Sequence, residues 1–276
     1  MGTLYICATP IGNLEDVSIR LLKTLRQVDI IACEDTRQTA KLLQRYRIKA
    51  RTVSYHRFNL RSREAQLIEY LRSGQDVALV SDAGMPAISD PGTELVQKVI
   101  QEGMAVVVIP GPSALISALA ISGLDTTRFV FEGFLPAKTG QRRERLASLV
   151  DEDRTIVFYE SPHRLLDTLR DIEQVLGERR IAAARELTKK FEEVVRGTVL
   201  EVLEYFTANP PRGEFTLVLE GKSASAEPVS EEDLLEEVEA LIARGVEKKE
   251  AFKIKAREYG LSKRYIYKLY LNKTDK

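Results

Sequence analysis

The stretch "DVALVSDAGMPAISDPGTELVQKVIQEGMAVVVIPGPSA", residues 76–114, contains one complete unit of strand, loop, helix and strand. Two short apolar runs, VALV and AVVVI, flank a segment whose apolar residues recur at the spacing of an amphipathic helix. Short, continuously apolar strands that alternate with helices are typical of a parallel sheet covered on both faces. The stretch therefore predicts an α/β fold.

The same alternation extends in both directions from this unit. Towards the N-terminus and through the unit itself we expect strands at 3–8, 29–33, 50–55, 76–80 and 105–110, with helices at 17–28, 37–46, 61–74 and 93–103. A second set of strands is expected at 128–134, 154–160, 180–186, 192–199 and 213–221. These strands are less evenly spaced, which favours a mixed sheet.

The chain divides into two α/β domains and a small helical C-terminal region. We expect an N-terminal domain at 1–117, a second domain at 125–221, a linker at 222–230 and a basic helical tail at 231–276. The boundary rests on a segment rich in Ser, Ala and Pro that leads into an acidic helix start, which Ser230 is expected to cap. Two domains imply a cleft between them.

Composition limits the function classes further. The 276 residues are 44% hydrophobic and 30% charged, which is typical of soluble globular proteins. No apolar run reaches the roughly 18 residues of a membrane-spanning helix, so we expect a cytoplasmic protein without a membrane partner. Cys7 and Cys33 lie in strand-like runs and are expected to be buried and inert. Neither belongs to a CxxC or CxxH pair, so no metal site is indicated.

Four strand ends carry loops of Gly, Pro and small polar residues. These loops are TPIGN (9–13), EDTR (34–37), SDAGMP (81–86) and PGPSA (110–114). Each alone is compatible with a simple turn. Because the carboxyl ends of parallel strands meet at one edge of a sheet, the four together predict a ligand site there.

The loops also indicate the chemistry of the ligand. They contain neither the GxGxxG pattern of dinucleotide sites nor a Walker A motif, and Asp82 and Asp90 would repel phosphate. A cationic molecule without phosphate fits better, and S-adenosylmethionine is one such molecule. Gly84 and Gly92 are expected to take positive φ or to allow a close backbone approach. The alternative is that Asp82 and Asp90 serve only as helix caps or Asx turns.

Eight motifs resemble those of one known family, the bacterial small-subunit rRNA (cytidine-2′-O)-methyltransferases of the tetrapyrrole methylase superfamily. They are TPIGNLEDVSIRLL, CEDTR, SDAGMPAISDPG, VIPGPSA, FEGFLP, YESPHR, ARELTKKFEE and GEFTLVLEG, in order between residues 9 and 221. The resemblance implies two α/β domains with S-adenosylmethionine in the interdomain cleft, and a homodimer. It further implies that the partner is the small ribosomal subunit and the acceptor a cytidine in the decoding centre of its 16S rRNA.

Matched residue by residue, the resemblance assigns a set of donor-binding positions. They are Pro10, Ile11, Gly12, Asp82, Ala83, Gly84, Ser113, Ala114, Tyr159, Glu160, Leu187, Glu214, Phe215 and Thr216. The chain departs from the family pattern at Ala8 and Met85, where Gly and Thr are usual. Ala8 is still a small residue in a tight turn. Met85 lacks the hydroxyl of Thr but keeps an apolar side chain.

Transfer to a ribose hydroxyl requires removal of its proton, so a general base is expected. Glu34 and Asp35 end the second strand and are the candidates, with Asn13 orienting the acceptor and Arg37 binding a phosphate. Alternatively, Glu34 and Asp35 cap the helix that follows. The two histidines, His56 and His163, each stand near an Arg and are expected to contact RNA or to be structural.

The tail supplies positive charge that the rest of the chain lacks. Its sequence around Ala256, Gly260 and Ile266 has the spacing of a helix-turn-helix, and Ser262 is expected to cap the last helix. The RNA-binding candidates on that helix are Lys263, Arg264, Tyr265 and Lys268. Alternatively, the tail is a basic hairpin packed on the body. Two other functions stay open, a porphyrin or corrin methyltransferase and a ribosome-binding module without catalysis.

Overall fold

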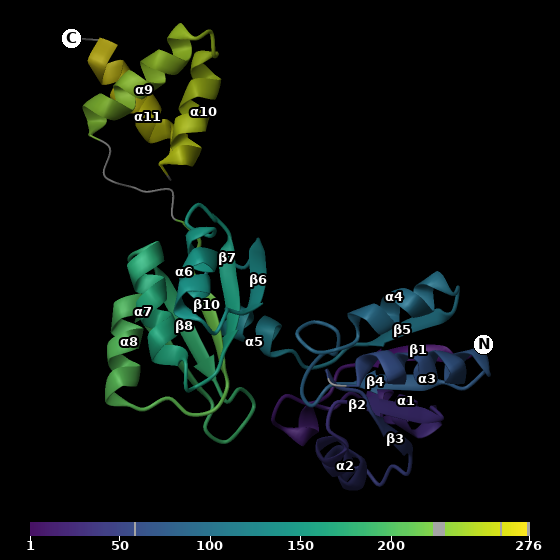
Figure 1. Ribbon diagram of the computed structural model, residues 1–276. Helices are drawn as coiled ribbons and strands as arrows, with labels where there is room; N and C mark the ends of the chain where they lie inside the picture. Colours follow the sequence, from purple (N-terminus) through teal and green to yellow (C-terminus); the bar gives the residue numbers. More distant parts are fainter. Residues whose placement is uncertain (58, 223–229, 260, 275–276) are drawn as a thin grey trace.

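The protein consists of two α/β units followed by three C-terminal helices (Figure 1). The computed structural model describes residues 1–57, 59–222, 230–259 and 261–274. Of the expected linker, residues 223–229 lie outside the described residues, as does Gly260 in the expected turn of the tail. Two five-stranded sheets, one in each unit, form the framework.

The first sheet is entirely parallel, with strand order β3-β2-β4-β1-β5. Its strands are β1 Thr3–Cys7, β2 Ile30–Cys33, β3 Arg51–Ser54, β4 Val77–Val80 and β5 Ala105–Ile109. The crossovers contain a 3-10 turn, η1 Leu14–Asp16, and the helices α1 Ile19–Gln27, α2 Thr36–Arg45, α3 Leu60–Arg72 and α4 Thr93–Gln101. The nine strands and helices expected between residues 3 and 110 are thereby confirmed.

Both faces of this sheet are covered because successive strand residues point to opposite sides. Along β4, Val77 and Leu79 lie in one apolar cluster with residues of α3 and α4. Ala78 and Val80 lie in a second cluster with residues of α1 and α2. Cys7 and Cys33 are fully buried in the second cluster, as expected. Burial raises the pKa of the Cys7 thiol to about 12, which keeps it protonated and unreactive.

The second sheet is mixed, which confirms the expectation from its uneven strand spacing. Its strands are β6 Phe129–Phe134, β7 Thr155–Glu160, β8 Arg180–Arg185, β9 Glu193–Thr198 and β10 Phe215–Leu219. The order is β6-β7-β10-β8-β9, with β6 and β7 parallel and the other neighbours antiparallel. Three helices cover one face: α6 Thr139–Ala147, α7 Leu165–Leu176 and α8 Val199–Ala208.

Helix α5, Ala114–Ile121, joins the two units and packs against the second sheet. Ala118 and Leu119 of this helix share an apolar cluster with Val157 of β7 and Val218 of β10. Figure 1 shows α5 between the two sheets. The expected end of the N-terminal domain, at residue 117, therefore falls inside a helix that belongs by its packing to the second unit.

The C-terminal helices form a core of their own. They are α9 Glu231–Ala243, α10 Lys248–Glu258 and α11 Lys263–Thr274, and Leu234, Val238, Phe252 and Ile266 pack together among them. Ser230 caps α9 by accepting from the Asp233 N–H, and Ser262 accepts from the Tyr265 N–H at the start of α11. Both expected caps are confirmed. Among the described residues, no helix is both long and apolar enough to cross a membrane.

Candidate functional site

A cavity of about 650 Å³ lies between the two α/β units. One wall is formed by residues that follow the strands of the first sheet, and the other by residues of β7, β10 and the end of β8. The start of α5 completes the lining. The cavity therefore lies beyond the carboxyl ends of the parallel strands, where ligands of open α/β sheets bind.

The loop after β4 is held in shape by backbone pairing with the loop after β1. The Thr9 N–H donates to the Gly84 carbonyl at 2.9 Å, and the Gly84 N–H donates to the Thr9 carbonyl at 3.1 Å. Gly84 and Gly92 have φ values of 79° and 145°, as expected for a loop that needs glycine. A Cβ at Gly92 would also lie 2.8 Å from the Leu79 side chain. The loop is therefore a preformed wall of the cavity.

Three carboxyl groups line the same end of the cavity: those of Glu34, Asp82 and Asp90. Strand register brings them together, because Cys33 at the end of β2 pairs with Val80 at the end of β4. Burial raises the pKa of Glu34, and the negative charges of Asp90 and Asp82 raise it further. Burial is also the main cause that raises the pKa of Asp90. This end of the cavity therefore attracts cations and holds a carboxyl with increased basicity.

Asp35 and Arg37 form a separate pair on the surface. The Asp35 carboxylate caps α2 by accepting from the Arg37 N–H at 2.8 Å and binds the Arg37 guanidinium at 2.7 Å. Hydrogen bonds from Arg37 lower the pKa of Asp35 to about 2. The Arg37 side chain is 88% exposed. The capping alternative thus describes Asp35, whereas its neighbour Glu34 lines the cavity.

The loop after β1 meets the second unit directly. The Asn13 N–H donates to the Thr188 hydroxyl at 3.0 Å, and the Asn13 side chain accepts from the Glu15 N–H. A Cβ on Gly12 would lie 2.5 Å from Cγ of Lys189. Of the described residues, those lining the cavity do not include Pro10, Gly12, Asn13, Asp35 or Arg37. Gly12 and Asn13 instead contact the 187–189 segment at its edge.

Tyr159 supplies an aromatic wall on the side of the second sheet. Its ring lies 5.0 Å from that of Phe131 in an edge-to-face arrangement and 5.6 Å from that of Phe134. Burial raises the pKa of the Tyr159 hydroxyl. Next to it, Glu160 accepts from the Ser161 N–H at 2.8 Å and from the Thr168 hydroxyl at 2.6 Å. The Glu160 carboxylate is therefore held within the second unit by its own hydrogen bonds.

Most of the residues expected at a donor site lie in this one cavity. They are Ile11, Asp82, Ala83, Gly84, Ser113, Ala114, Tyr159, Glu160, Leu187, Glu214, Phe215 and Thr216, together with Glu34 of the catalytic candidates. The lining residues that sequence reasoning did not assign are Met85, Ile88, Ser89, Asp90, Pro110, Gly111, Leu115, Ile116, Phe134, Ala184, Glu186 and Lys189. Nearly all of these residues lie within or next to a quoted motif, and that position was the one signal in the sequence that could have identified them.

The RNA-binding candidates lie far along the chain, on α11. Lys263, Arg264, Tyr265 and Lys268 are all exposed, and Ile266 between them is fully buried in the core of the tail. The Tyr265 hydroxyl donates to the Glu231 carboxylate of α9 at 2.9 Å. Tyr265 is therefore tied to α9, while Lys263, Arg264 and Lys268 are each exposed to solvent.

The cavity residues fit S-adenosylmethionine. The carboxyl groups of Asp82, Glu34 and Asp90 suit its positive sulfonium and amino groups, and the side chains of Met85, Leu115 and Leu187 suit its apolar parts. The backbone pairing of Thr9 with Gly84 fixes the loop after β4, and Gly84 lines the cavity. No Lys or Arg other than Lys189 lines the cavity among the described residues, which suits a ligand without phosphate.

Comparison with known proteins adds close relatives. "Ribosomal RNA small subunit methyltransferase I" of Synechocystis sp. is 50% identical over 273 residues, covering 98% of each chain. The protein of the same name from Bacillus subtilis is 46% identical over 277 residues, covering 98% of this chain and 94% of its own. That of Thermotoga maritima is 53% identical over 222 residues, covering 80% of this chain and all of its own.

Solved structures with the same fold are more distant in sequence. Diphthine synthase superposes with a TM-score of 0.62 at 14% identity, covering 81% of this chain and 91% of its own. Uroporphyrin-III C-methyltransferase from Thermus thermophilus, complexed with S-adenosylhomocysteine, superposes with a TM-score of 0.56 at 17% identity, covering 80% and 97%.

A family model covers most of the two α/β units. Residues 3–203 match the model of the tetrapyrrole (corrin/porphyrin) methylases, a family whose methyl donor is S-adenosylmethionine. The two α/β sheets and the cavity between the units agree with this match. The chain therefore belongs to the tetrapyrrole methylase family.

Proposed function

We propose that the protein transfers a methyl group from S-adenosylmethionine to the 2′-oxygen of a cytidine in 16S rRNA of the small ribosomal subunit, at the decoding centre. The observation that carries the proposal is the identity of 50% over 98% of the chain to a relative named as a small-subunit rRNA methyltransferase. The acidic interdomain cavity supports a cationic methyl donor.

The bound donor supplies a methyl group that is already activated by its sulfonium. The residues that hold it are those of the paired loops after β1 and β4, with Asp82 facing its positive groups. Tyr159 and Leu187 enclose its apolar part from the second unit. Holding the acceptor oxygen close and in line can supply roughly 7–11 kcal/mol of the barrier. Placement is therefore the main task of the protein.

Glu34 is the general base in this proposal. It lines the cavity, and burial together with the charges of Asp90 and Asp82 raises its pKa, which makes it a stronger base than an ordinary glutamate. Asp35 is less suited as a base, because Arg37 lowers its pKa to about 2. Its oxygens already accept from the Arg37 guanidinium and from the Arg37 N–H at the start of α2. Asn13 and Arg37 lie outside the cavity lining, which suits contacts with the RNA around the target nucleotide.

The helical tail provides the second contact with RNA in this proposal. Lys263, Arg264 and Lys268 are exposed on α11, with Tyr265 among them. Cations of this kind bind phosphate, while an aromatic ring stacks on bases. A homodimer, which the family resemblance implies, stays a prediction that sedimentation of the purified chain tests.

The decisive experiment is methyl transfer from radiolabelled S-adenosylmethionine to small ribosomal subunits from cells that lack the protein. Digestion to nucleosides and mass spectrometry then identify the product. The expected result is one 2′-O-methylated cytidine. Transfer to a different nucleotide or atom would overturn the finer proposal. Transfer to a porphyrin or corrin, with none to subunits or free rRNA, would support the small-molecule alternative instead.

A further inference from the structure

Phe191 is 72% exposed, although Phe is among the residues most often buried. It lies in the turn between β8 and β9, residues 186–192, which we name the 186–192 loop. Single exposed apolar residues are common on protein surfaces, so exposure alone indicates nothing. The construction and the position of this loop distinguish Phe191 from the other exposed apolar residues.

The 186–192 loop is closely hydrogen-bonded. Glu186 and Thr188 have φ values of 50° and 67°, a backbone region that non-glycine residues seldom occupy. The Thr188 N–H donates to the Glu192 carboxylate at 2.6 Å, and the Glu192 N–H donates to the Lys189 carbonyl at 3.1 Å. Strained backbone of this kind persists only where surrounding contacts hold it. The loop therefore presents Phe191 in a defined conformation.

The same loop forms part of the cavity edge. Glu186, Leu187 and Lys189 line the cavity, and Thr188 accepts the hydrogen bond from the Asn13 N–H of the first unit. Phe191 follows Lys189 by two residues, so their Cα atoms are at most about 7.6 Å apart. The backbone that carries the exposed ring is thus close to the edge of the proposed donor cavity.

A lysine side chain lies over the exposed ring. Glu186 pairs with Lys189 at 2.8 Å, Glu192 accepts from the Thr188 N–H, and Glu193 pairs with Arg185 at 2.7 Å. The three carboxylates balance the charges of Arg185, Lys189 and Lys190, and of these cations Lys190 is held by neither ion pair. The ammonium of Lys190 lies 5.6 Å from the centroid of the Phe191 ring. An aromatic face beside a lysine is the combination that binds single-stranded nucleic acid, by base stacking and phosphate contact.

We propose that Phe191 is a stacking platform for an unpaired base next to the target nucleotide, and that Lys190 contacts the phosphate of that base. The inference rests on the proposed function, since it assumes an RNA acceptor at the cavity. It assigns the 186–192 loop two tasks. Its Leu187 side encloses the donor, and its Phe191 side positions the RNA strand.

The test compares Phe191→Ala, Phe191→Trp and the control Leu200→Ala, which removes an apolar side chain that is 51% exposed on α8. The substrate is the small subunit from cells lacking the protein, and the donor affinity of each variant is measured by calorimetry. Loss of one stacked base costs a factor of about 5 to 150 in affinity. We expect KM for the subunit to rise by that factor in Phe191→Ala, with unchanged donor affinity. Phe191→Trp and Leu200→Ala should resemble the unmodified protein.

Salt dependence separates the roles of the two residues. Lys190→Ala should reduce the slope of log affinity against log salt by about one unit or less, because one phosphate contact is lost. Phe191→Ala should leave that slope unchanged. Equal reduction in both variants would contradict a stacking role for Phe191.

Three results would overturn the inference in distinguishable ways. If the unmodified protein methylates subunits and Phe191→Ala has the same KM, the stacking platform is wrong and the proposed function stands. If Phe191→Ala changes only the sedimentation of the chain, the ring covers a second copy of the protein instead of RNA. If the unmodified protein neither binds nor methylates subunits, the proposed function itself has failed, and the inference with it.

Discussion

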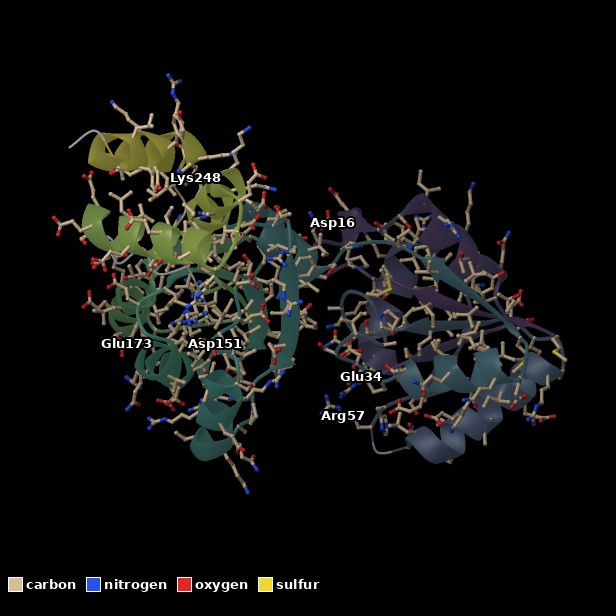
Figure 2. All side chains as sticks on the ribbon, turned by 90° about the horizontal axis from the view of Figure 1, so that it is seen from above. Asp16, Glu34, Arg57, Asp151, Glu173 and Lys248 are labelled. Carbon is tan, nitrogen blue, oxygen red and sulfur yellow. The ribbon has the colours of Figure 1, made fainter. Side chains whose placement is uncertain are left out.

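Asp82 accepts a hydrogen bond from the backbone N–H of Asp35 through its Oδ1 atom, at 3.0 Å. This bond joins the residues that follow β2 to those that follow β4, two neighbouring parallel strands. It fixes the point at which the chain turns into α2, so Asp35 faces the helix start and the preceding Glu34 faces the cavity. Figure 2 shows Glu34 on the side of the first unit that is turned towards the second.

Glu34→Gln should reduce the rate of methyl transfer by a factor of about 10² to 10⁴, because the amide cannot accept the proton. Donor affinity should fall by a smaller factor, because Glu34 is only one of three carboxyl groups at this end of the cavity. In the unmodified protein the rate should rise with pH through a pKa higher than that of an ordinary glutamate, since burial and neighbouring carboxylates raise the pKa of Glu34. The pH–rate profile of single-turnover transfer measures this.

Asp35→Ala is the matched control for that variant. It removes the cap of α2, which should lower the free energy of unfolding by about 0.5–2 kcal/mol, while most of the transfer rate is retained. A rate loss in Asp35→Ala as large as that in Glu34→Gln would contradict the assignment of the base.

Asp82→Lys should abolish binding of S-adenosylmethionine, because an ammonium replaces a carboxylate that faces the sulfonium and amino groups. Isothermal calorimetry measures the donor affinity directly. Asp82→Asn, which keeps an acceptor for the Asp35 N–H, separates loss of charge from loss of loop structure and should bind more weakly than the unmodified protein. Unchanged affinity in Asp82→Lys would refute the electrostatic role.

Asp90→Asn should change the pH dependence of stability in the free protein. Burial raises the folded-state pKa of Asp90, so the folded chain binds the proton more tightly than the unfolded chain does. The free energy of unfolding should then fall as pH rises from about 4 through the raised pKa. Asp90→Asn should lack this component of the fall. Chemical denaturation at several pH values compares the two proteins, and parallel curves would disprove the prediction.

Gly12→Ala should weaken the closure between the two units. The added Cβ would lie 2.5 Å from Lys189 Cγ, 2.9 Å from Thr188 Oγ1 and 3.0 Å from the Leu187 carbonyl oxygen. Overpacking of this kind costs about 1–3 kcal/mol, which corresponds to a donor affinity lower by about 5-fold to 150-fold. Gly140→Ala is the control, since its Cβ would meet nothing within 4 Å. Equal donor affinities in the two variants would rule out a closure role for Gly12.

Deletion of residues 223–276 should leave donor binding intact and weaken binding to the small subunit. The three helices have their own apolar core, so their removal does not open the cores of the two sheets. The salt dependence of subunit binding should become shallower, because the cations of α11 are lost. Filter binding over a range of salt concentrations provides the comparison. Identical slopes would assign the tail a role other than RNA binding.

Periodicity alone was sufficient to predict the strands of both sheets and the helices of the first unit, because the local hydrophobic pattern shows which positions are buried. Periodicity did not predict helix α5. Its sequence, ALISALAI, is apolar except for Ser117, so it lacks the alternation of apolar and polar residues that marks an amphipathic helix. The helix connects the two units and packs on the second sheet. A short apolar segment of this kind is equally compatible with a buried strand and with a helix.

The cavity depended on motifs as well as on tertiary structure. Asp82, Gly84 and Ser113 were identifiable because their loops carry unusual residues at strand ends. Phe134 and Lys189 also line the cavity and lie within quoted motifs, but those motifs did not show which of their side chains face it. Their places follow from the packing of the second unit against the first, which no local pattern records.

By itself the sequence determined the α/β class, the five strands of each sheet and the acidic, glycine-containing loops at the strand ends. Only the tertiary structure decided which of two adjacent acids, Glu34 or Asp35, faces the cavity and which caps a helix. The physical reason is that strand and helix formation depend on neighbours along the chain. The environment of a carboxyl group depends instead on burial and on charges that other strands bring close.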